Sequence, residues 1–359
     1  MSTVPIWAHQ RGVPGEEGQP CTGAMPDCTG VSGSEVTLSV VIPTRGRQEL
    51  LRQVLQALAR QTYPAHRFEV VVVVDGSEDG TTQMLNDLRL PYRLIPIWQK
   101  QSGPARARNV GVARASGEIV LFVDDDVIPA ANFLEEHVRF HDDEKAVVIG
   151  RVSPDPGARR PGWSRWEEQM LDRHFKALAE GRRRVVGRHV YSGNFSVRKK
   201  HFVSVGGFDE AMRRAEDIDL GHRLEQLGLG FYFSPKADGI HCGHRSYDAW
   251  KKIPYQYGRL DVIMGRDKGY PDEMRRIFTT FHKRHLLVRL PVVACLDREG
   301  VSSAFLGLLR CITYCGDVAG LSRVTRYLYS EISNLLYWQG VSDELGGSKS
   351  FWLEIQRVG

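Results

Sequence analysis

Residues 117–129 read Gly-Glu-Ile-Val-Leu-Phe-Val-Asp-Asp-Asp-Val-Ile-Pro, and this stretch decides the fold. The run 119–123 is apolar without alternation, as expected of a strand that is buried on both faces in a parallel sheet. Asp124, Asp125 and Asp126 therefore lie at the carboxyl edge of that strand, where open α/β sheets bind ligands. Crowded carboxylates repel one another unless a cation is present, so the triplet favours a hard divalent ion with oxygen ligands. For the triplet alone, the alternative is a solvated turn that caps the next helix.

Two strand and helix units precede this stretch. Residues 38–42 form a short apolar strand that ends in Pro-Thr-Arg-Gly-Arg at 43–47, and a helix with a one-sided apolar face follows. Residues 68–74 form a second buried strand that ends at Asp75, and residues 81–88 can form the helix after it. Successive units of this kind imply right-handed crossovers and a mainly parallel sheet flanked by helices.

The composition is that of a globular protein. Of 359 residues, 42% are hydrophobic and 25% are charged, which is enough for one large α/β domain plus an appendage. The net charge of +5 is small for this length, and we expect no nucleic-acid partner. The six cysteines lack a compact framework spacing, so we expect reduced thiols in a cytoplasmic protein, with a Cys21–Cys28 bridge as the alternative. No secretion signal and no run of about 18 apolar residues is found, so no membrane span is predicted.

Two later segments bring charged side chains toward the same edge. Residues 102–115 start with Ser-Gly-Pro and continue in good helix formers, which places Arg106 and Asn109 on a helix that leads into the acidic strand. The planar guanidinium of Arg106 matches phosphate oxygens, although a solvated helix face explains it equally well. Glu216 and Asp217 begin another helix, whose exposed amides favour a carboxylate and keep it ionised. A plain helix cap is the alternative.

Histidines and a basic segment mark the rest of the chain. His241 and His244 could supply a nitrogen ligand to a metal held mainly by carboxylates, whereas a zinc site would need a Cys-x-x-Cys partner that is missing. From residue 249 onward the pattern is helical, with basic residues gathered at 275–289. Two interpretations stay open: a peripheral contact of residues 275–338 with the inner face of the membrane, and a helical subdomain packed on the main sheet.

Taken together, these motifs resemble the family 2 glycosyltransferases, inverting enzymes of the GT-A fold with an Asp-x-Asp motif. The resemblance runs from about residue 38 to about residue 244 and keeps the order and spacing of several separate motifs. It implies a GT-A α/β domain at residues 37–248. The Gly- and Pro-rich residues 1–36 precede it as a poorly ordered extension, and the mostly helical residues 249–359 follow. It also implies that the protein moves a sugar from a nucleotide-diphosphate sugar, usually of uridine, to an acceptor hydroxyl with Mn²⁺ or Mg²⁺.

The resemblance further implies which residues bind the donor. Asp75 would accept a hydrogen bond from the base, and Asp124 would reach the ribose or a metal-bound water. The turn after the first strand reads Arg-Gly-Arg where the family more often has Tyr-Asn-Arg, so less is expected of Arg47. The residues expected to line the nucleotide-sugar are Pro43, Thr44, Arg45, Asp75, Arg106, Asp124, Asp125 and Asn194.

Other residues would serve the metal and the acceptor. By the same resemblance Asp126 would ligate the ion, with Asp124 and His241 as further contacts. Glu216 and Asp217 look like the pair that holds the catalytic base, and Asp217 is the better placed. The identity of the acceptor stays open among a lipid-linked saccharide, another glycoconjugate, a peptide and a small metabolite.

Three other functions would use parts of this pattern. A sugar nucleotidyltransferase also places acids and a metal on a doubly wound sheet, but it breaks a bond between phosphates. A non-catalytic protein would bind the sugar nucleotide without turnover. A dinucleotide oxidoreductase would need Gly-x-Gly-x-x-Gly after the first strand, which residues 43–47 do not provide.

Overall fold

The structure is a computed structural model, and it describes residues 37–212, 214–243 and 245–358. The predicted N-terminal extension, the Cys21–Cys28 alternative and His244 lie outside the described residues. Within them, Cys295, Cys311 and Cys315 form no disulfide.

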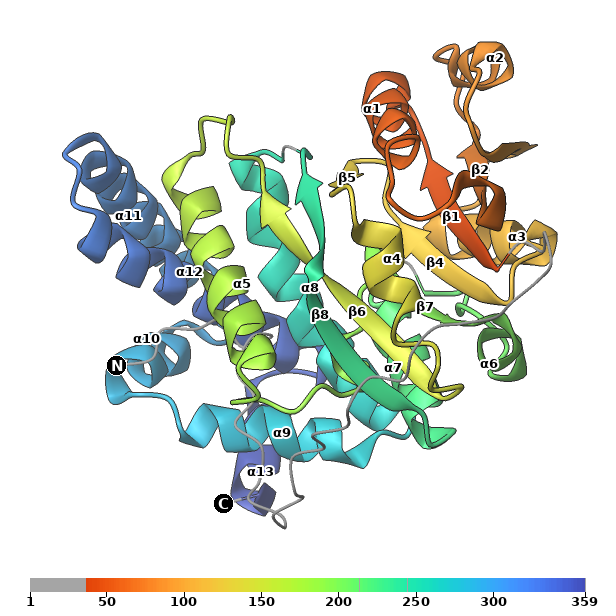
Figure 1. Ribbon diagram of the computed structural model, residues 1–359. Helices are drawn as coiled ribbons and strands as arrows, with labels where there is room; N and C mark the ends of the chain where they lie inside the picture. The colour runs from red at the N-terminus through yellow and green to blue at the C-terminus, as the bar shows by residue number, and fades with distance from the viewer. Residues whose placement is uncertain (1–36, 213, 244, 359) are drawn as a thin grey trace. The chain divides into compact units, whose positions relative to one another are not determined.

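An eight-stranded mixed sheet forms the centre of the fold (Figure 1). Its strands are β1 (Leu38–Thr44), β2 (Phe68–Asp75), β3 (Arg93–Gln99), β4 (Ile119–Val123), β5 (Val127–Pro129), β6 (Ala146–Pro154), β7 (Asn194–Arg198) and β8 (Gly230–His241). Their order in space is β3-β2-β1-β4-β7-β6-β8-β5. Strands β3, β2, β1 and β4 are parallel, as are β6 and β8, whereas β7 is antiparallel to β4 and β6, and β5 to β8. The predicted α/β fold is therefore confirmed, and β7 joins its two parallel parts.

The sheet is covered on both faces, as the unbroken apolar runs predict. Leu38, Val40 and Ile42 of β1 pack in one apolar cluster with the first helix, and Val41 packs in a second cluster on the other face. Gly111 lets the third helix lie close to β1, because a Cβ there would stand 2.4 Å from the Val41 side chain. The helices around the sheet are α1 (Gln48–Leu58), α2 (Thr81–Asp87), α3 (Pro104–Arg114), α4 (Phe133–Val138), α6 (Lys199–Ser204) and α7 (Glu216–Gln226), with short 3₁₀ turns η2 (Ala65–Arg67) and η3 (Gly187–His189).

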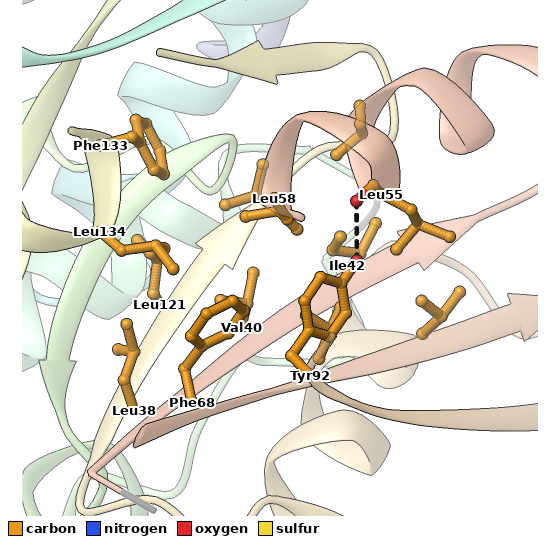
Figure 2. Close-up of a cluster of buried hydrophobic side chains, with 14 of the residues drawn as sticks. Leu38, Val40, Ile42, Leu55, Leu58, Phe68, Tyr92, Leu121, Phe133 and Leu134 are labelled. Atoms are coloured by element: carbon orange, nitrogen blue, oxygen red, sulfur yellow. Dashed lines mark hydrogen bonds between the residues drawn. The ribbon is translucent and has the colours of Figure 1, made fainter. Parts of the chain in front are cut away.

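The cluster under α1 offers a matched test of one buried hydrogen bond (Figure 2). The Tyr92 hydroxyl donates to the Leu55 carbonyl at 2.8 Å, whereas the buried Tyr63 hydroxyl in the same cluster has no partner among the described residues. We expect Tyr92→Phe to lower the free energy of unfolding by about 1 kcal/mol. Tyr63→Phe should leave it unchanged or raise it. Urea denaturation of both variants measures the difference, and equal losses would contradict the assignment.

The described residues form two compact units. The sheet unit comprises residues 37–155 and 175–243, and the helical unit comprises residues 156–174 and 245–358. Residues 156–174 belong to the helical unit because Trp163 pairs with Trp250 there, with ring centroids 5.6 Å apart. The sequence alone assigns that segment to the transferase domain.

The helical unit has its own aromatic core, built around Phe281, Trp338 and Phe351. Its helices are α8 (Tyr247–Arg266), α9 (Pro271–His282), α10 (Leu286–Cys295), α11 (Glu299–Val318), α12 (Ser322–Glu344) and α13 (Ser348–Val358), preceded by the start of α5 (Gly162–Ala179). The helical character predicted from residue 249 onward is confirmed. In the part of the chain that the structure describes, none of the helices combines the length and apolarity needed to cross a bilayer.

Candidate active site

The three aspartates lie in the turn between β4 and β5, at the carboxyl end of β4. The Val127 N–H donates to the Asp124 carbonyl at 3.1 Å and closes the turn. The Cys242 N–H, just after β8, donates to the Asp126 carbonyl at 2.8 Å. The backbone of the turn is thus held from two sides, which fixes the carboxylates relative to the sheet.

Arg47 supplies a positive charge to two of these acids. Its Nη1 lies 2.9 Å from Asp125 Oδ1 and 2.7 Å from Asp126 Oδ2, although the Arg47 side chain is 47% exposed. The Thr44 hydroxyl donates to the other oxygen of Asp125 at 2.8 Å. Burial raises the pKa of Asp125 to about 6, and the Arg47 charge opposes that rise. The sequence pattern assigns Arg47 little weight, yet it provides the cation that crowded carboxylates need.

Asp126 and His241 form the corner of the site that best suits a metal ion. Asp126 Oδ2 lies 3.7 Å from His241 Nε2, longer than a hydrogen bond but within the roughly 4 Å that can separate two ligands of one ion. Gly243 keeps this corner open, because a Cβ there would stand 2.5 Å from Asp126 Oδ2. Arg47 is a stand-in cation at the same oxygen. Across the described ranges, no three His, Cys, Asp or Glu side chains gather closely enough to hold an ion by themselves.

Arg108 on α3 connects the acidic turn to the start of α7. Its Nη2 lies 2.6 Å from Asp124 Oδ1, and its Nη1 lies 3.1 Å from Glu216 Oε1. Arg108 is buried, and its guanidinium lies over the Phe208 ring at 5.6 Å from the centroid. The Asp124 side chain is 37% exposed, but Arg108 and Glu216 are buried, and each of these two charges would be costly without a partner. Arg108 therefore holds the acidic turn and the start of α7 together.

Asp217 follows in the first turn of α7. Its carboxylate accepts hydrogen bonds from the Ser192 N–H at 3.1 Å and the Ile218 N–H at 2.9 Å. Ala215, which precedes the acidic pair, has a φ of 60°, a strained left-handed conformation for a residue with a Cβ. Burial and then the negative charge of Glu216 raise the pKa of Asp217 to about 7. The sequence predicts that the helix terminus keeps Asp217 ionised; desolvation outweighs that effect, so this carboxyl titrates near neutral pH.

Asp75, expected at the base of the nucleotide, lies buried at the end of β2. Its carboxylate accepts hydrogen bonds from the Gln99 side chain at 2.8 Å and from the N–H groups of Ser102 at 2.7 Å and Gly103 at 2.9 Å. A carboxylate has about four acceptor positions, so one remains for a donor from a ligand. Asp75 therefore holds the backbone at the entry to α3.

The other residues expected at the nucleotide differ in exposure. Pro43 is partly buried, and Arg45 is exposed in the turn after β1. The Arg106 side chain is 56% exposed, and its Nη1 lies 3.6 Å from Glu210 Oε2. Side chains two positions apart on a helix point about 200° away from each other. Because Arg108 points toward the acids, Arg106 points away from them. Arg108 is thus the α3 arginine that pairs with the acidic turn, and a contact of Arg106 with the diphosphate stays a prediction.

Asn194 is a buried structural residue, which corrects its expected place at the donor sugar. It starts β7 and is fully buried. Its Nδ2 donates to the carbonyls of Arg151 at 2.7 Å and Ala237 at 2.9 Å, and its Oδ1 lies 2.7 Å from His137 Nε2. Burial lowers the pKa of His137 to about 4, so a neutral imidazole donates to Asn194. The amide joins strands and a helix rather than facing a ligand.

Arg108 is the site residue that sequence reasoning missed, although a signal existed. Ala105, Arg108 and Val112 share one helical face, and all three are buried on α3. An arginine on an otherwise apolar face needs a buried counterion, and the acidic strand supplies one. Gly193 was also missed. A Cβ there would stand 2.8 Å from Asp124 Oδ2, so a glycine lets the segment before β7 approach the acidic turn after β4.

Comparison with known proteins finds similarity to glycosyltransferases. The glycosyl transferase family 2 model matches residues 39–206, which include the acidic turn. Validoxylamine A glucosyltransferase of Streptomyces hygroscopicus subsp. limoneus is 30% identical over 258 residues, or 64% of this chain and 57% of that protein. The glycosyltransferase YfnE of Bacillus subtilis is 29% identical over 305 residues, or 68% of this chain and 78% of that protein. The chain spans little more than half the length of the first of these relatives.

Two solved structures share the fold. Residues 1–349 of TarS from Staphylococcus aureus align with a TM-score of 0.52 at 19% identity, covering 84% of this chain and 90% of that one. A mannosyltransferase from Pyrobaculum calidifontis, solved with GDP-Man and Mn²⁺, aligns with a TM-score of 0.53 at 19% identity, covering 83% and 86%. These alignments confirm the predicted GT-A fold.

Proposed function

We propose that this chain, whose residues 39–206 match the glycosyl transferase family 2 model, transfers a sugar from a nucleotide-diphosphate sugar to an acceptor hydroxyl, with inversion at the anomeric carbon. The observation that carries the proposal is the path of contacts from Asp124 through Arg108 to Glu216, next to Asp217. These contacts connect two places: the sheet edge, where a diphosphate would bind, and a carboxyl group that can take a proton. A UDP-sugar is the donor we favour, because Asp75 keeps an acceptor position that suits the N–H of a uracil ring.

The residues at the acidic edge fit a hard divalent ion. Asp126 and His241 would hold Mn²⁺ or Mg²⁺, and Asp124, in the same turn as Asp126, would be a further contact. When bound, such an ion would neutralise the charge that develops on a leaving diphosphate. Arg47 would have to release Asp126 first, and its guanidinium could then pair with a phosphate oxygen.

Asp217 is the proposed general base. Two of its acceptor positions are used by backbone N–H groups, which orient the carboxylate and leave other positions for an acceptor hydroxyl. A pKa near the working pH suits a group that must be ionised before the reaction and protonated after it. Glu216 is less available, because Arg108 already holds its carboxylate. A single displacement, with the acceptor attacking opposite the diphosphate, gives inversion.

The test is turnover of a panel of nucleotide-sugars by the purified full chain with Mn²⁺. Acceptors should include soluble saccharides, a lipid extract and other hydroxyl compounds, and the nucleoside diphosphate released is measured. Release that depends on an acceptor supports the proposal. Release of pyrophosphate instead would identify a sugar nucleotidyltransferase, and donor binding without turnover would identify a non-catalytic binding protein.

The metal site gives a prediction that needs no activity. Asp126→Asn should weaken Mn²⁺ binding at least ~10-fold, because it removes a carboxylate from the proposed ligands. Electron paramagnetic resonance of unbound Mn²⁺ measures the affinity. Asp142→Asn, at an exposed aspartate of the same unit, is the control and should change nothing. Unchanged Mn²⁺ affinity in Asp126→Asn, or full turnover in excess EDTA, would remove the metal from the proposal.

A further inference from the structure

Helix α11 has an exposed face that is almost free of charge. The helix begins at the exposed Glu299; over residues 300–318, all of which the structure describes, Arg310 is the only exposed charged side chain. Leu308 is 56% exposed and Val318 is 76% exposed. The opposite face, with Leu309 and Thr313, is buried. A helix that is apolar on both faces is expected to be covered on both.

The helices that contact α11 carry further exposed apolar side chains. Of the sixteen large hydrophobic side chains that are exposed within the described residues, eleven lie between residues 286 and 324. Singly scattered apolar residues are normal on a protein surface, but such a concentration marks a binding surface. We call it the α10–α11 surface, and it consists of Leu286, Leu287, Leu290, Val293, Val301, Leu308, Ile312, Tyr314, Val318, Leu321 and Val324.

The charges around the α10–α11 surface are mainly positive. Residues 282–326 contain seven Lys and Arg against three Asp and Glu, although the whole chain carries only +5. Lys283, Arg298 and Arg323 are exposed beside the apolar residues. Arg310 lies over the Tyr247 ring at 4.9 Å from its centroid, which holds its charge at the border of the apolar face. Apolar side chains bordered by cations are the pattern of helices that lie in the interface of an anionic membrane.

The structure also shows which of the basic side chains are exposed to solvent. The sequence predicts a basic cluster at residues 275–289, but the Arg276 side chain is only 14% exposed and pairs with Asp261 at 2.7 Å and with Glu273 at 2.7 Å. Arg284 is partly buried, with its Nε and Nη2 atoms shielded from solvent, and this burial lowers the pKa of its side chain to about 10. Of the basic side chains in that cluster, Arg275 and Lys283 are exposed, and Arg298, Arg310 and Arg323 add exposed cations further along the chain.

We propose that the α10–α11 surface docks this protein onto an anionic membrane, with α11 lying in the plane of the interface. A second copy of the chain is the less suitable occupant, because a two-fold interface would bring the same cations together. A lipid surface of opposite charge has no such penalty. This inference concerns localisation and stands independently of the transferase chemistry.

The test is co-sedimentation of the purified full chain with vesicles of phosphatidylcholine, alone or with about 30% phosphatidylglycerol. We expect binding to the anionic vesicles only, and weaker binding as salt rises. The double variant Leu308→Ser/Ile312→Ser should bind at least ~10-fold more weakly. The matched control is Val203→Ser/Leu227→Ser, which removes two exposed apolar side chains from the sheet unit and should bind like the wild type.

Two further measurements separate the alternatives. Asp126→Asn should bind vesicles normally, so failure of the proposed chemistry and failure of membrane docking can be told apart. Sedimentation equilibrium reports the oligomeric state. A dimer that the Leu308/Ile312 variant dissociates, without vesicle binding, would overturn the proposal in favour of a second copy. Absence of vesicle binding from a monomer, or equal binding by the variant and its control, would overturn it as well.

Discussion

Arg108→Gln is expected to lower kcat at least ~100-fold and to lower the free energy of unfolding by about 3 kcal/mol. The guanidinium contacts Asp124 at 2.6 Å and Glu216 at 3.1 Å in a buried position, so its loss leaves two carboxylates without a countercharge. The acidic turn and the start of α7 would then lose their common anchor. A displacement of about 1 Å is enough for a rate loss of this size. Steady-state kinetics and urea denaturation measure the two effects.

The variant Arg106→Gln is the matched control, because Arg106 is a mostly exposed arginine two residues away on the same helix. It should change unfolding by no more than about 0.5 kcal/mol and leave kcat close to normal. The double variant Arg108→Gln/Glu216→Gln should be more stable than the sum of the single changes predicts, since it removes one of the stranded charges. If Arg106→Gln is the more damaging change, then Arg106 is the arginine that serves the acidic edge, and Arg108 does not anchor it.

The strands of the fold were predictable where burial is complete. Every residue of β2 and β4 is buried. In the sequence β4 is an unbroken apolar run, and β2 contains a run of five valines between Glu69 and Asp75. Strand β3 has no fully buried residue and contains Pro96, because it forms the edge of the sheet, and its pattern does not stand out. The antiparallel direction of β7 depends on the path of the chain over many residues. The apolar pattern within a strand does not show in which direction that strand runs in the sheet.

The site residues that could be predicted are those whose place follows from the end of a strand or the start of a helix. The acids after β4 and the pair at the start of α7 needed only the element boundaries. The choice between Arg106 and Arg108 needed the rotational phase of α3, which the buried Ala105 and Val112 provide. The inward direction of Asn194 was not predictable, because it depends on where strands of distant sequence approach β7. The raised pKa of Asp217 likewise depends on desolvation by tertiary packing, whereas the helix terminus is visible in the sequence.

Asp217→Asn is expected to lower kcat at least ~100-fold while donor affinity stays within a few-fold of normal. The substitution keeps the size of the side chain and removes the group that would take the acceptor proton. Asp217 contacts the N–H groups of Ser192 and Ile218, and an asparagine oxygen can accept at least one of these bonds, so the fold should persist. Calorimetric titration with the donor separates binding from turnover. Loss of donor binding would instead place Asp217 in the donor site.

The pH profile of the same pair of enzymes tests the assignment more sharply. Burial and the charge of Glu216 raise the pKa of Asp217 to about 7, and only its ionised form can act as a base. As pH falls through that value the carboxylate becomes protonated, so kcat/KM of the wild type should fall about tenfold per pH unit on the acid side. The residual activity of Asp217→Asn should lack this acid limb. Glu216→Gln should keep an acid limb, displaced to lower pH because the neighbouring negative charge is gone. An unchanged acid limb in Asp217→Asn would mean that another group is the base.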